Sequence, residues 1–463
     1  MRQIWLAACL LLAVPAGAEP PGGEATDWIG VGGASAELVP EPVFGGRMML
    51  YRAGPRDADA VVLIHGLGNN AARDWSKVIP ALAESYQVYA LDLPGFGQSD
   101  KGNHLYSPEN YVRAIDAVLA ERVPRPFALI GHSMGGAIAL AYAAAYPRRV
   151  RRLIVVDAAG VLLRSVYAEF LGRAAAERAI GMDLPRIDAL LRLIQNYADS
   201  LPAKSDIVLE NAEVRRRLLR GDPGAIAALA LTEHDFSRAL RSITAPTLVI
   251  WGSDDKVAPL RTGEVVAGVI PGAQLVVIPG AGHEPHLEKP QRFNAIVLDE
   301  LRGRLEAKPY ALRRAKIQGG RTARCVGERG QEFSGDYERL ILDNCADVEI
   351  TDARIGFLRA TSSTVRIVNS QIRDGVGASG SRLELTAGVV GGSPPLMLYA
   401  TSVDAAGTRF ESEDVIAANR GNVPVTLRLS VTEMSRANAA RESEPSRGTT
   451  LHRQNSTMSF RGF

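Results

Sequence analysis

The stretch LIGHSMGGAIALAYA, Leu129 to Ala143, places one serine between glycines at the junction of two different patterns. An apolar run typical of a buried strand precedes Ser133, and an alanine-rich run typical of a helix follows it. The pattern G-x-S-x-G holds a serine in a strained strand-to-helix turn, where the flanking glycines allow close approach of the backbone. The helix N-terminus directs N–H groups at this turn, so the backbone N–H of Met134 would stabilise an oxyanion. The stretch therefore makes Ser133 a candidate nucleophile, and a small residue at a strand-to-helix turn is the alternative at this point.

The sequence around this stretch alternates between strands and helices. Continuous apolar runs, AVVLIHG, YQVYALDLPG, LIVVDAAG, TLVIWG and LVVIPG, are separated by segments with helical spacing. This alternation predicts an α/β fold with a doubly wound, mostly parallel sheet over residues 46–308. Residues 161–241 interrupt it with helical patterns only. An insert of this kind predicts a helical cap over the carboxyl ends of the strands, where ligands bind in open sheets.

A serine hydroxyl is a weak nucleophile at neutral pH and needs a base. Of the seven histidines, His283 is the best candidate, because it follows the last core strand in the segment IPGAGHEPHLEKP. His286 is the alternative base, although a surface position or a helix start suits it better. The carboxylate that orients the base comes from Asp254 or Asp255, which both directly follow the strand TLVIWG. Nucleophile, acid and base then stand in the chain order Ser…Asp…His.

A second motif, HGLG, stands at His65 to Gly68, where an earlier strand ends. At this position the backbone N–H of Leu67 would be a second oxyanion donor beside that of Met134. His65 is expected to order this loop. His132 adjoins the nucleophile and is expected to pack away from it.

Five motifs together resemble those of the α/β-hydrolase superfamily, in its capped esterase-like and lipase-like branch. They are HGLG, DLPGFGQSD, GHSMGG, WGSDDKVAP and GAGHEPHLEKPQRF, and the resemblance covers about residues 46–307. It implies that Asp255 rather than Asp254 is the acid, and that His283 is the base. It also implies a serine hydrolase that cleaves a carboxylic ester, from a small molecule or a lipid, through an acyl-enzyme. Ser133 differs from the aspartate nucleophile of haloalkane dehalogenases.

Two other functions stay open at this point. One is a different reaction on the same triad, C–C bond hydrolysis or perhydrolysis, although C–C hydrolases usually carry asparagine where this chain has His132. The other is a non-catalytic binding or adhesion protein that uses its C-terminal part. No metal and no cofactor is expected, because no cluster of cysteine, histidine or carboxylate suggests one. Cap side chains expected to line a substrate pocket are Tyr167, Phe170, Ile194 and Tyr197.

Residues 315–431 favour β structure, with glycine, asparagine and aspartate at the turns. Apolar residues recur at i, i+2 and i+7 in the segments VEITDARI, VRIVNSQI, LELTAGVV and VDAAGTRF. Successive copies start 17, 18 and 20 residues apart. Short strands at such a period bury their apolar rows by stacking on one another, which predicts a β-solenoid. A small β-sandwich with irregular strands is the alternative.

Cys325 and Cys345 lie 20 residues apart, about one coil of such a solenoid. Stacked strands are separated by roughly 4.8 Å, which falls within the Cα separations of disulfides. The two cysteines can therefore form a disulfide. Residues 432–463 are rich in serine, arginine and asparagine and are expected to be disordered. A glycan, a surface or a second copy of the chain are the expected partners of the β-rich region.

The first residues indicate export. A positive start, the apolar run Ile4 to Val14 and a small-residue site predict a signal peptide over residues 1–18 and a leader or linker over 19–45. A lipid anchor on Cys9 is the alternative. The apolar run is too short to span a bilayer, so a periplasmic or secreted protein is expected. A formal net charge of +2, from 53 basic and 51 acidic residues, gives no support for binding nucleic acid.

Overall fold

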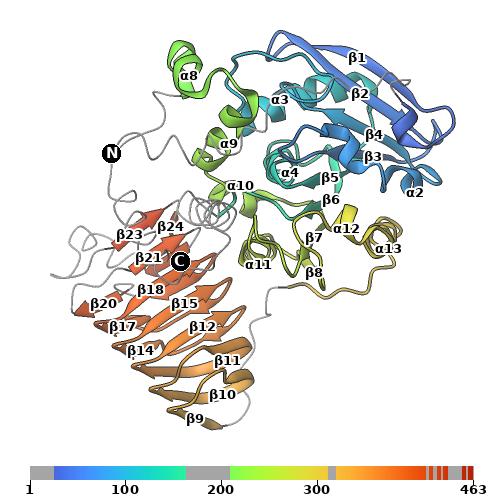
Figure 1. The fold of residues 1–463 in the computed structure, drawn as a ribbon. Helices are drawn as coiled ribbons and strands as arrows, with labels where there is room; N and C mark the ends of the chain where they lie inside the picture. Colours follow the sequence, from blue (N-terminus) through green and yellow to red (C-terminus); the bar gives the residue numbers. More distant parts are fainter. Residues whose placement is uncertain are drawn as a thin grey trace, which may run out of the picture. The chain divides into compact units, whose positions relative to one another are not determined.

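The computed structural model describes residues 26–162, 209–310, 320–412, 417–420, 425–428, 431–435, 451–454 and 457–461 (Figure 1). The chain divides into two compact units. We call them the α/β unit, which comprises residues 1–235, 242–263 and 275–307, and the β unit, which comprises residues 236–241, 264–274 and 308–463.

The α/β unit is built on an eight-stranded sheet with the strand order β1-β2-β4-β3-β5-β6-β7-β8. Its strands are β1 (Ser35–Glu41), β2 (Gly46–Ala53), β3 (Ala60–Ile64), β4 (Gln87–Asp92), β5 (Phe127–His132), β6 (Val150–Val156), β7 (Thr247–Gly252) and β8 (Gln274–Ile278). The pairs β1–β2 and β2–β4 are antiparallel. The pairs from β4 through β3, β5 and β6 to β7 are parallel, so the mostly parallel sheet expected from the sequence is confirmed.

Helices cover both faces of this sheet, which explains why its strands are apolar on both sides. The helical segments of the α/β unit are η1 (Asp27–Ile29), η2 (Ala71–Trp75), α2 (Ile79–Ala83), α3 (Pro108–Arg122), α4 (Met134–Ala145), α12 (Pro285–Glu288) and α13 (Pro290–Leu301). Helix α11 (Leu260–Val269) begins in the α/β unit and ends in the β unit. On β5, Ile130 joins the core cluster that contains α2 and α13. The next residue, Gly131, lies against α4 on the opposite face. No helix among the described residues is long and apolar enough to cross a membrane.

The α/β unit begins earlier than the sequence predicted, because β1 lies within the expected leader of residues 19–45. All seven residues of β1 pair with β2, from Ser35 opposite Arg52 to Glu41 opposite Gly46. The carboxylate of Glu41, which is 3% exposed, accepts hydrogen bonds from the backbone N–H groups of Val43, Phe44 and Gly46. This buried carboxylate therefore accepts the hydrogen bonds of backbone N–H groups in the turn between the two strands. Composition alone does not reveal this contribution.

The described part of the predicted cap is helical. It contains α8 (Ala212–Leu219), α9 (Pro223–Glu233) and α10 (Ser237–Ser242), and no strand is assigned over residues 209–242. Asn211 and Asp222 cap α8 and α9 by accepting hydrogen bonds from backbone N–H groups of the first turn. The pocket residues expected in the cap, Tyr167, Phe170, Ile194 and Tyr197, lie outside the described residues.

The β unit is a curled parallel sheet in which each sequence repeat pairs with the next (Figure 1). Its strands are β9 (Thr322–Val326), β10 (Glu332–Asp343), β11 (Val348–Thr361), β12 (Thr364–Val368), β13 (Gln371–Ile372), β14 (Val376–Ser379), β15 (Arg382–Thr386), β16 (Val389–Val390), β17 (Leu396–Tyr399), β18 (Ser402–Ala406), β19 (Arg409–Ser412), β20 (Ala417–Arg420), β21 (Val425–Arg428), β22 (Val431–Ser435), β23 (Leu451–Gln454) and β24 (Thr457–Arg461). The apolar positions i, i+2 and i+7 lie opposite their counterparts, as in Val348–Val365, Ile350–Ile367 and Ile355–Ile372. They are buried in one core, which is why the period is visible in the sequence.

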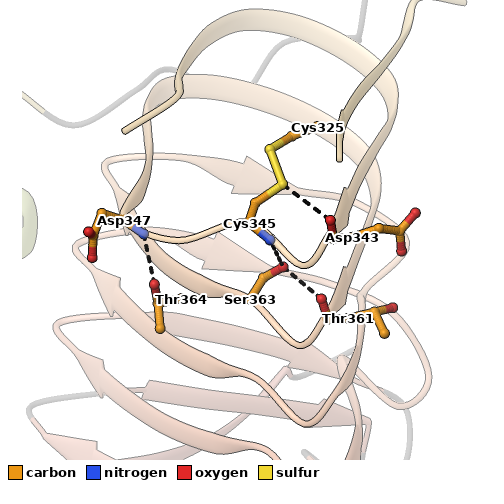
Figure 2. The surroundings of a disulfide bond; sticks show 7 residues. All are labelled: Cys325, Asp343, Cys345, Asp347, Thr361, Ser363 and Thr364. Atoms are coloured by element: carbon orange, nitrogen blue, oxygen red, sulfur yellow. Dashed lines mark hydrogen bonds between the residues drawn. A yellow bond between two sulfur atoms is a disulfide. The ribbon is translucent and has the colours of Figure 1, made fainter. Parts of the chain in front are cut away.

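A column of hydroxyl groups marks one corner of the β unit. Ser363 Oγ accepts a hydrogen bond from the Cys345 N–H at 3.0 Å and donates one to the Thr361 carbonyl at 2.7 Å (Figure 2). Ser381 and Thr401 repeat the arrangement in the next two sequence repeats. Side chains here complete backbone hydrogen bonds that a turn would otherwise leave unmade.

Cys325 and Cys345 are joined by a disulfide at the end of the β unit that contains β9, and their Cα atoms are 6.4 Å apart. The bond links β9 to the turn after β10. It closes a loop between two cysteines that are 20 residues apart in the sequence. We expect its reduction to lower the free energy of unfolding of the β unit by about 3 kcal/mol, because the unfolded chain regains the entropy of an open loop. Thermal unfolding with and without reductant measures this effect, and a Cys325→Ser/Cys345→Ser variant should be insensitive to reductant. Identical wild-type transitions in both conditions would contradict the prediction.

The expectation of a disordered segment from residue 432 differs from the structure at three places. Strands β22, β23 and β24 all contain residues from this segment. Here β23 pairs in parallel with β21, and β24 pairs with β22. An edge strand presents open backbone hydrogen-bonding groups, so a segment of low apolar content can extend the sheet through its backbone.

Candidate active site

Ser133 occupies a sharp turn between β5 and α4, with φ 53° and ψ −119°. A β-carbon at Gly131 would lie 2.2 Å from the Gly135 carbonyl oxygen, and one at Gly135 would lie 2.3 Å from the Ile64 carbonyl oxygen. Both glycines are therefore required by close backbone approach. A backbone conformation of this kind costs roughly 1–3 kcal/mol and persists where the surrounding structure enforces it. The Ser133 N–H donates to the Val156 carbonyl at 2.9 Å, which fixes the turn against β6.

The structure brings Ser133, His283 and Asp255 together. His283 Nε2 lies 2.9 Å from Ser133 Oγ, and His283 Nδ1 lies 2.8 Å from Asp255 Oδ2. The other oxygen of Asp255 accepts hydrogen bonds from the backbone N–H groups of Val257 and Ala258, at 2.7 and 3.0 Å. The carboxylate is thus fixed to accept the Nδ1 proton of His283, which leaves Nε2 free to accept the serine proton.

Asp254 does not take part in this arrangement. Its side chain is exposed and accepts a hydrogen bond from Ser253 Oγ at 2.6 Å. The Asp255 side chain is instead fully buried, and the side chain of His283 is 18% exposed. Of the two carboxylates that the strand TLVIWG could supply, the geometry therefore selects Asp255.

The loop that carries His283 is held by two side chains. Glu288 accepts hydrogen bonds from the N–H groups of Gly282 and Glu284, at 2.8 and 3.0 Å, so it spans the residues on both sides of the base. His132 Nε2 lies 2.7 Å from the His283 carbonyl oxygen and donates to it. His132 is buried as expected, but it contacts the base loop in addition to packing. No sequence pattern singles out Glu288, which stands five residues after His283 in a charged segment.

The HGLG loop, which is expected to supply an oxyanion donor, lies beside Ser133. A β-carbon at Gly66 would lie 3.0 Å from Ser133 Cβ, so the HGLG turn packs directly on the serine. Within the described parts of the chain, the backbone N–H groups of Leu67 and Met134 have no hydrogen-bond partner. His65 orders the loop as expected. Its Nε2 accepts from the Leu93 N–H at 3.0 Å, so Nδ1 carries the proton and donates to the Gly66 carbonyl at 2.6 Å.

His286 is fully buried, which corrects the expectation of a surface residue. It lies in the first turn of α12, which begins at Pro285, and its ring packs 4.5 Å from that of His132 and 4.8 Å from that of Trp75, centroid to centroid. Neither ring nitrogen of His286 has a partner among the described residues. Burial lowers the pKa of His286 to about 3 and holds the pKa of His132 well below its usual range. Both rings are therefore neutral core residues at neutral pH.

This burial predicts acid sensitivity of the fold. The folded pKa of His286 lies below its ordinary value of 6.5, so the unfolded chain binds a proton that the folded chain does not. Stability is then complete above about pH 6.5 and falls towards pH 3, by roughly 1.4 kcal/mol per pH unit for one such histidine. Denaturant unfolding between these pH values measures the slope. A His286→Leu variant should show a smaller slope, and an unchanged slope would contradict the prediction.

Asp157 is a further ionisable residue at this site that the sequence did not single out. It directly follows β6, is fully buried, and accepts a hydrogen bond from the Gly252 N–H through Oδ1 at 2.9 Å. Asp157, Asp255 and His283 each place a polar atom within 4.8 Å of the others, the spacing of a metal site. Because Asp255 and His283 already bond to each other, a metal would have to displace that hydrogen bond.

Residues 59–290 match the family model described as alpha/beta hydrolase fold, which is half of the chain. The chain belongs to the α/β-hydrolase family. The match spans all three residues of the Ser133–His283–Asp255 cluster and ends before β9, the first strand of the curled parallel sheet. The family therefore accounts for most of the α/β unit and gives no information about the strands β9 to β24.

Several relatives of this hydrolase are similar over most of their own length. An uncharacterised protein of Mycobacterium tuberculosis is 30% identical over 295 residues, 58% of this chain and 83% of the relative. The 2-hydroxy-6-oxononadienedioate/2-hydroxy-6-oxononatrienedioate hydrolase of Cupriavidus pinatubonensis is 33% identical over 253 residues, 53% of this chain and 87% of the relative. Among solved structures, a thermophilic esterase from Thermogutta terrifontis is 26% identical with a TM-score of 0.43, over 58% of this chain and 98% of its own.

Proposed function

We propose that this hydrolase cleaves carboxylic esters through an acyl-enzyme formed on Ser133. The observation that carries the proposal is the continuous hydrogen-bonded line from Asp255 through the His283 ring to Ser133 Oγ, with distances of 2.8 and 2.9 Å. A nucleophile, a base and an orienting carboxylate at these distances are the constellation that activates a serine hydroxyl. The substrate class we propose is a small-molecule or lipid ester.

Each residue has a defined step in this proposal. As Ser133 Oγ attacks the acyl carbon, His283 Nε2 takes its proton, and Asp255 stabilises the imidazolium. The N–H groups of Leu67 and Met134 donate to the oxyanion of the tetrahedral intermediate. His283 then returns the proton to the leaving alcohol, and in the second half-reaction it activates the water that hydrolyses the acyl-enzyme.

C–C bond hydrolysis on the same triad is the second candidate. It is favoured by the names of several relatives, among them the dienedioate hydrolase that is 33% identical. The residue before the nucleophile favours the ester instead. His132 donates to the His283 carbonyl and is buried, so it does not present an amide to a substrate as asparagine would.

Labelling with a fluorophosphonate probe tests whether Ser133 is an activated nucleophile. We expect the wild type to be labelled and Ser133→Ala to remain unlabelled, and equal labelling of both proteins would contradict the proposal. A panel of nitrophenyl esters and vinylogous diketones then distinguishes the two reactions. Faster turnover of the diketones would favour C–C bond hydrolysis over ester hydrolysis.

We also propose that the protein is exported, with cleavage after Ala18. The disulfide between Cys325 and Cys345 supports this, because disulfides persist in oxidising compartments. N-terminal sequencing of the protein purified from cell envelopes or medium should then begin at Glu19. An intact N-terminus in the soluble cell extract would contradict export.

A further inference from the structure

The Asp157 carboxyl group is buried at the triad without a complete set of hydrogen-bond partners. Its backbone has φ 42°, and the residue is 0% exposed. Oδ1 accepts from the Gly252 N–H at 2.9 Å, which links the end of β6 to the end of β7. Oδ2 is buried and receives no hydrogen bond from any described residue. An ionised carboxylate with one unsatisfied, fully buried oxygen is strongly destabilising.

The neighbours of Asp157 make a second negative charge here still less favourable. Asp255 is a neighbouring carboxylate, and polar atoms of Asp157, Asp255 and His283 lie within 4.8 Å of one another. Glu288, which holds the His283 loop, adds a further negative charge nearby. Asp255 must be the ionised partner, because it accepts from two backbone N–H groups and from His283. Two carboxyl groups in one buried site ionise in turn rather than together.

We propose that Asp157 is a positioning residue of the triad, which keeps its proton on Oδ2 and donates it in a hydrogen bond to the Asp255 carboxylate. This inference rests on the proposed function, because it assigns Asp255 as the acid of the triad. In this proposal Asp157 acts through Asp255 rather than on the reacting atoms.

The direction of the Asp157 pKa agrees with this assignment. Burial raises the pKa of Asp157 well above its ordinary range, and the charge of Asp255 raises it further. The pair then carries one negative charge, which faces the imidazolium when His283 takes the serine proton. The donated hydrogen bond would be a further contact on Asp255, beside those from His283 and from the backbone N–H groups of Val257 and Ala258.

Two substitutions test whether Asp157 acts as a proton donor, as a charged group or only by filling space. Asp157→Asn keeps an acceptor for the Gly252 N–H and presents an N–H to Asp255. Asp157→Leu removes both. We expect the leucine variant to lose about 10-fold or more in kcat with little change in KM, and the asparagine variant to restore kcat to within about threefold of the wild type. Asp254→Asn is the matched control, since it removes an exposed charge from the neighbouring loop.

The pH profile of kcat/KM gives a readout that a purely structural role would not change. With a neutral Asp157, the asparagine variant keeps the wild-type acid limb, whereas the leucine variant moves it to higher pH because Asp255 loses a donor. If Asp157 were ionised, asparagine would remove a negative charge near His283. The acid limb would then move to lower pH by about one to two units, which would overturn the proposal.

Infrared spectroscopy tests the proton itself, independently of turnover. The difference spectrum between wild type and Asp157→Asn at neutral pH should contain the C=O stretch of a protonated carboxyl group. Absence of this band would overturn the proposal even if Asp157→Leu fails to fold. Since the band requires no catalysis, it is expected whether or not the protein hydrolyses esters, so failure of the proposed function and failure of this inference are distinguishable.

Discussion

Replacing Ser133 with alanine should lower kcat for a nitrophenyl ester by about 10⁵–10⁶-fold, while KM and thermal stability remain close to the wild type. The substitution removes only the hydroxyl group, whose Oγ lies 2.9 Å from His283 Nε2. Alanine retains the β-carbon, so the strained backbone at φ 53° is no more unfavourable than before. The residual rate over water would come from oxyanion stabilisation and binding alone.

Steady-state kinetics with the purified variant measures this loss. Ser85→Ala is a suitable control, because Ser85 is exposed and follows α2, away from the elbow in the sequence. We expect the control to retain wild-type kcat. A Ser133→Ala variant with kcat within about tenfold of the wild type would exclude a nucleophilic serine at this position.

Replacing Asp255 with asparagine should lower kcat by about 10⁴-fold, although the change is nearly isosteric. The N–H groups of Val257 and Ala258 both point at one oxygen of Asp255, so they fix the amide oxygen of asparagine in that place. The amide NH₂ then faces His283 Nδ1, which has to become an acceptor. The proton moves to Nε2, and the base can no longer accept the proton of Ser133.

Asp254→Asn is the matched control for this prediction. It makes the same chemical change one residue earlier, on an exposed side chain that bonds only to Ser253 among the described contacts. We expect its kcat to stay within about twofold of the wild type. Equal losses in the two variants, measured with the same ester, would show that a general charge effect rather than the His283 tautomer is responsible.

The repeats of the β unit could be predicted because apolar residues recur at the same positions of each repeat. Val348, Val365 and Leu383 each follow a turn and start the same apolar row, and the structure places them opposite one another. The three residues Ser133, Asp255 and His283 could be predicted from the sequence for a related reason, because each ends or follows an apolar strand. Parallel strands bring such positions to one edge of the sheet.

Other features depend on contacts between distant residues and leave no local pattern. Asp157 reads as an ordinary residue at a strand end, and only the three-dimensional structure places it beside Asp255. His286 follows the base by three residues, and the spacing alone does not tell a buried ring from an exposed one. Strand β1 was missed because the surrounding glycines and prolines dominate the composition, whereas its pairing with β2 decides the structure.

Trapping the acyl-enzyme tests the account most directly. Rapid acid quench after mixing with a nitrophenyl ester, followed by intact and peptide mass spectrometry, should reveal one acyl group on the peptide that contains Ser133. Asp255→Asn should form the adduct far more slowly, and Ser133→Ala should not form it. Ester turnover without any adduct on the wild type, or an adduct that persists in Ser133→Ala, would contradict the proposed nucleophile.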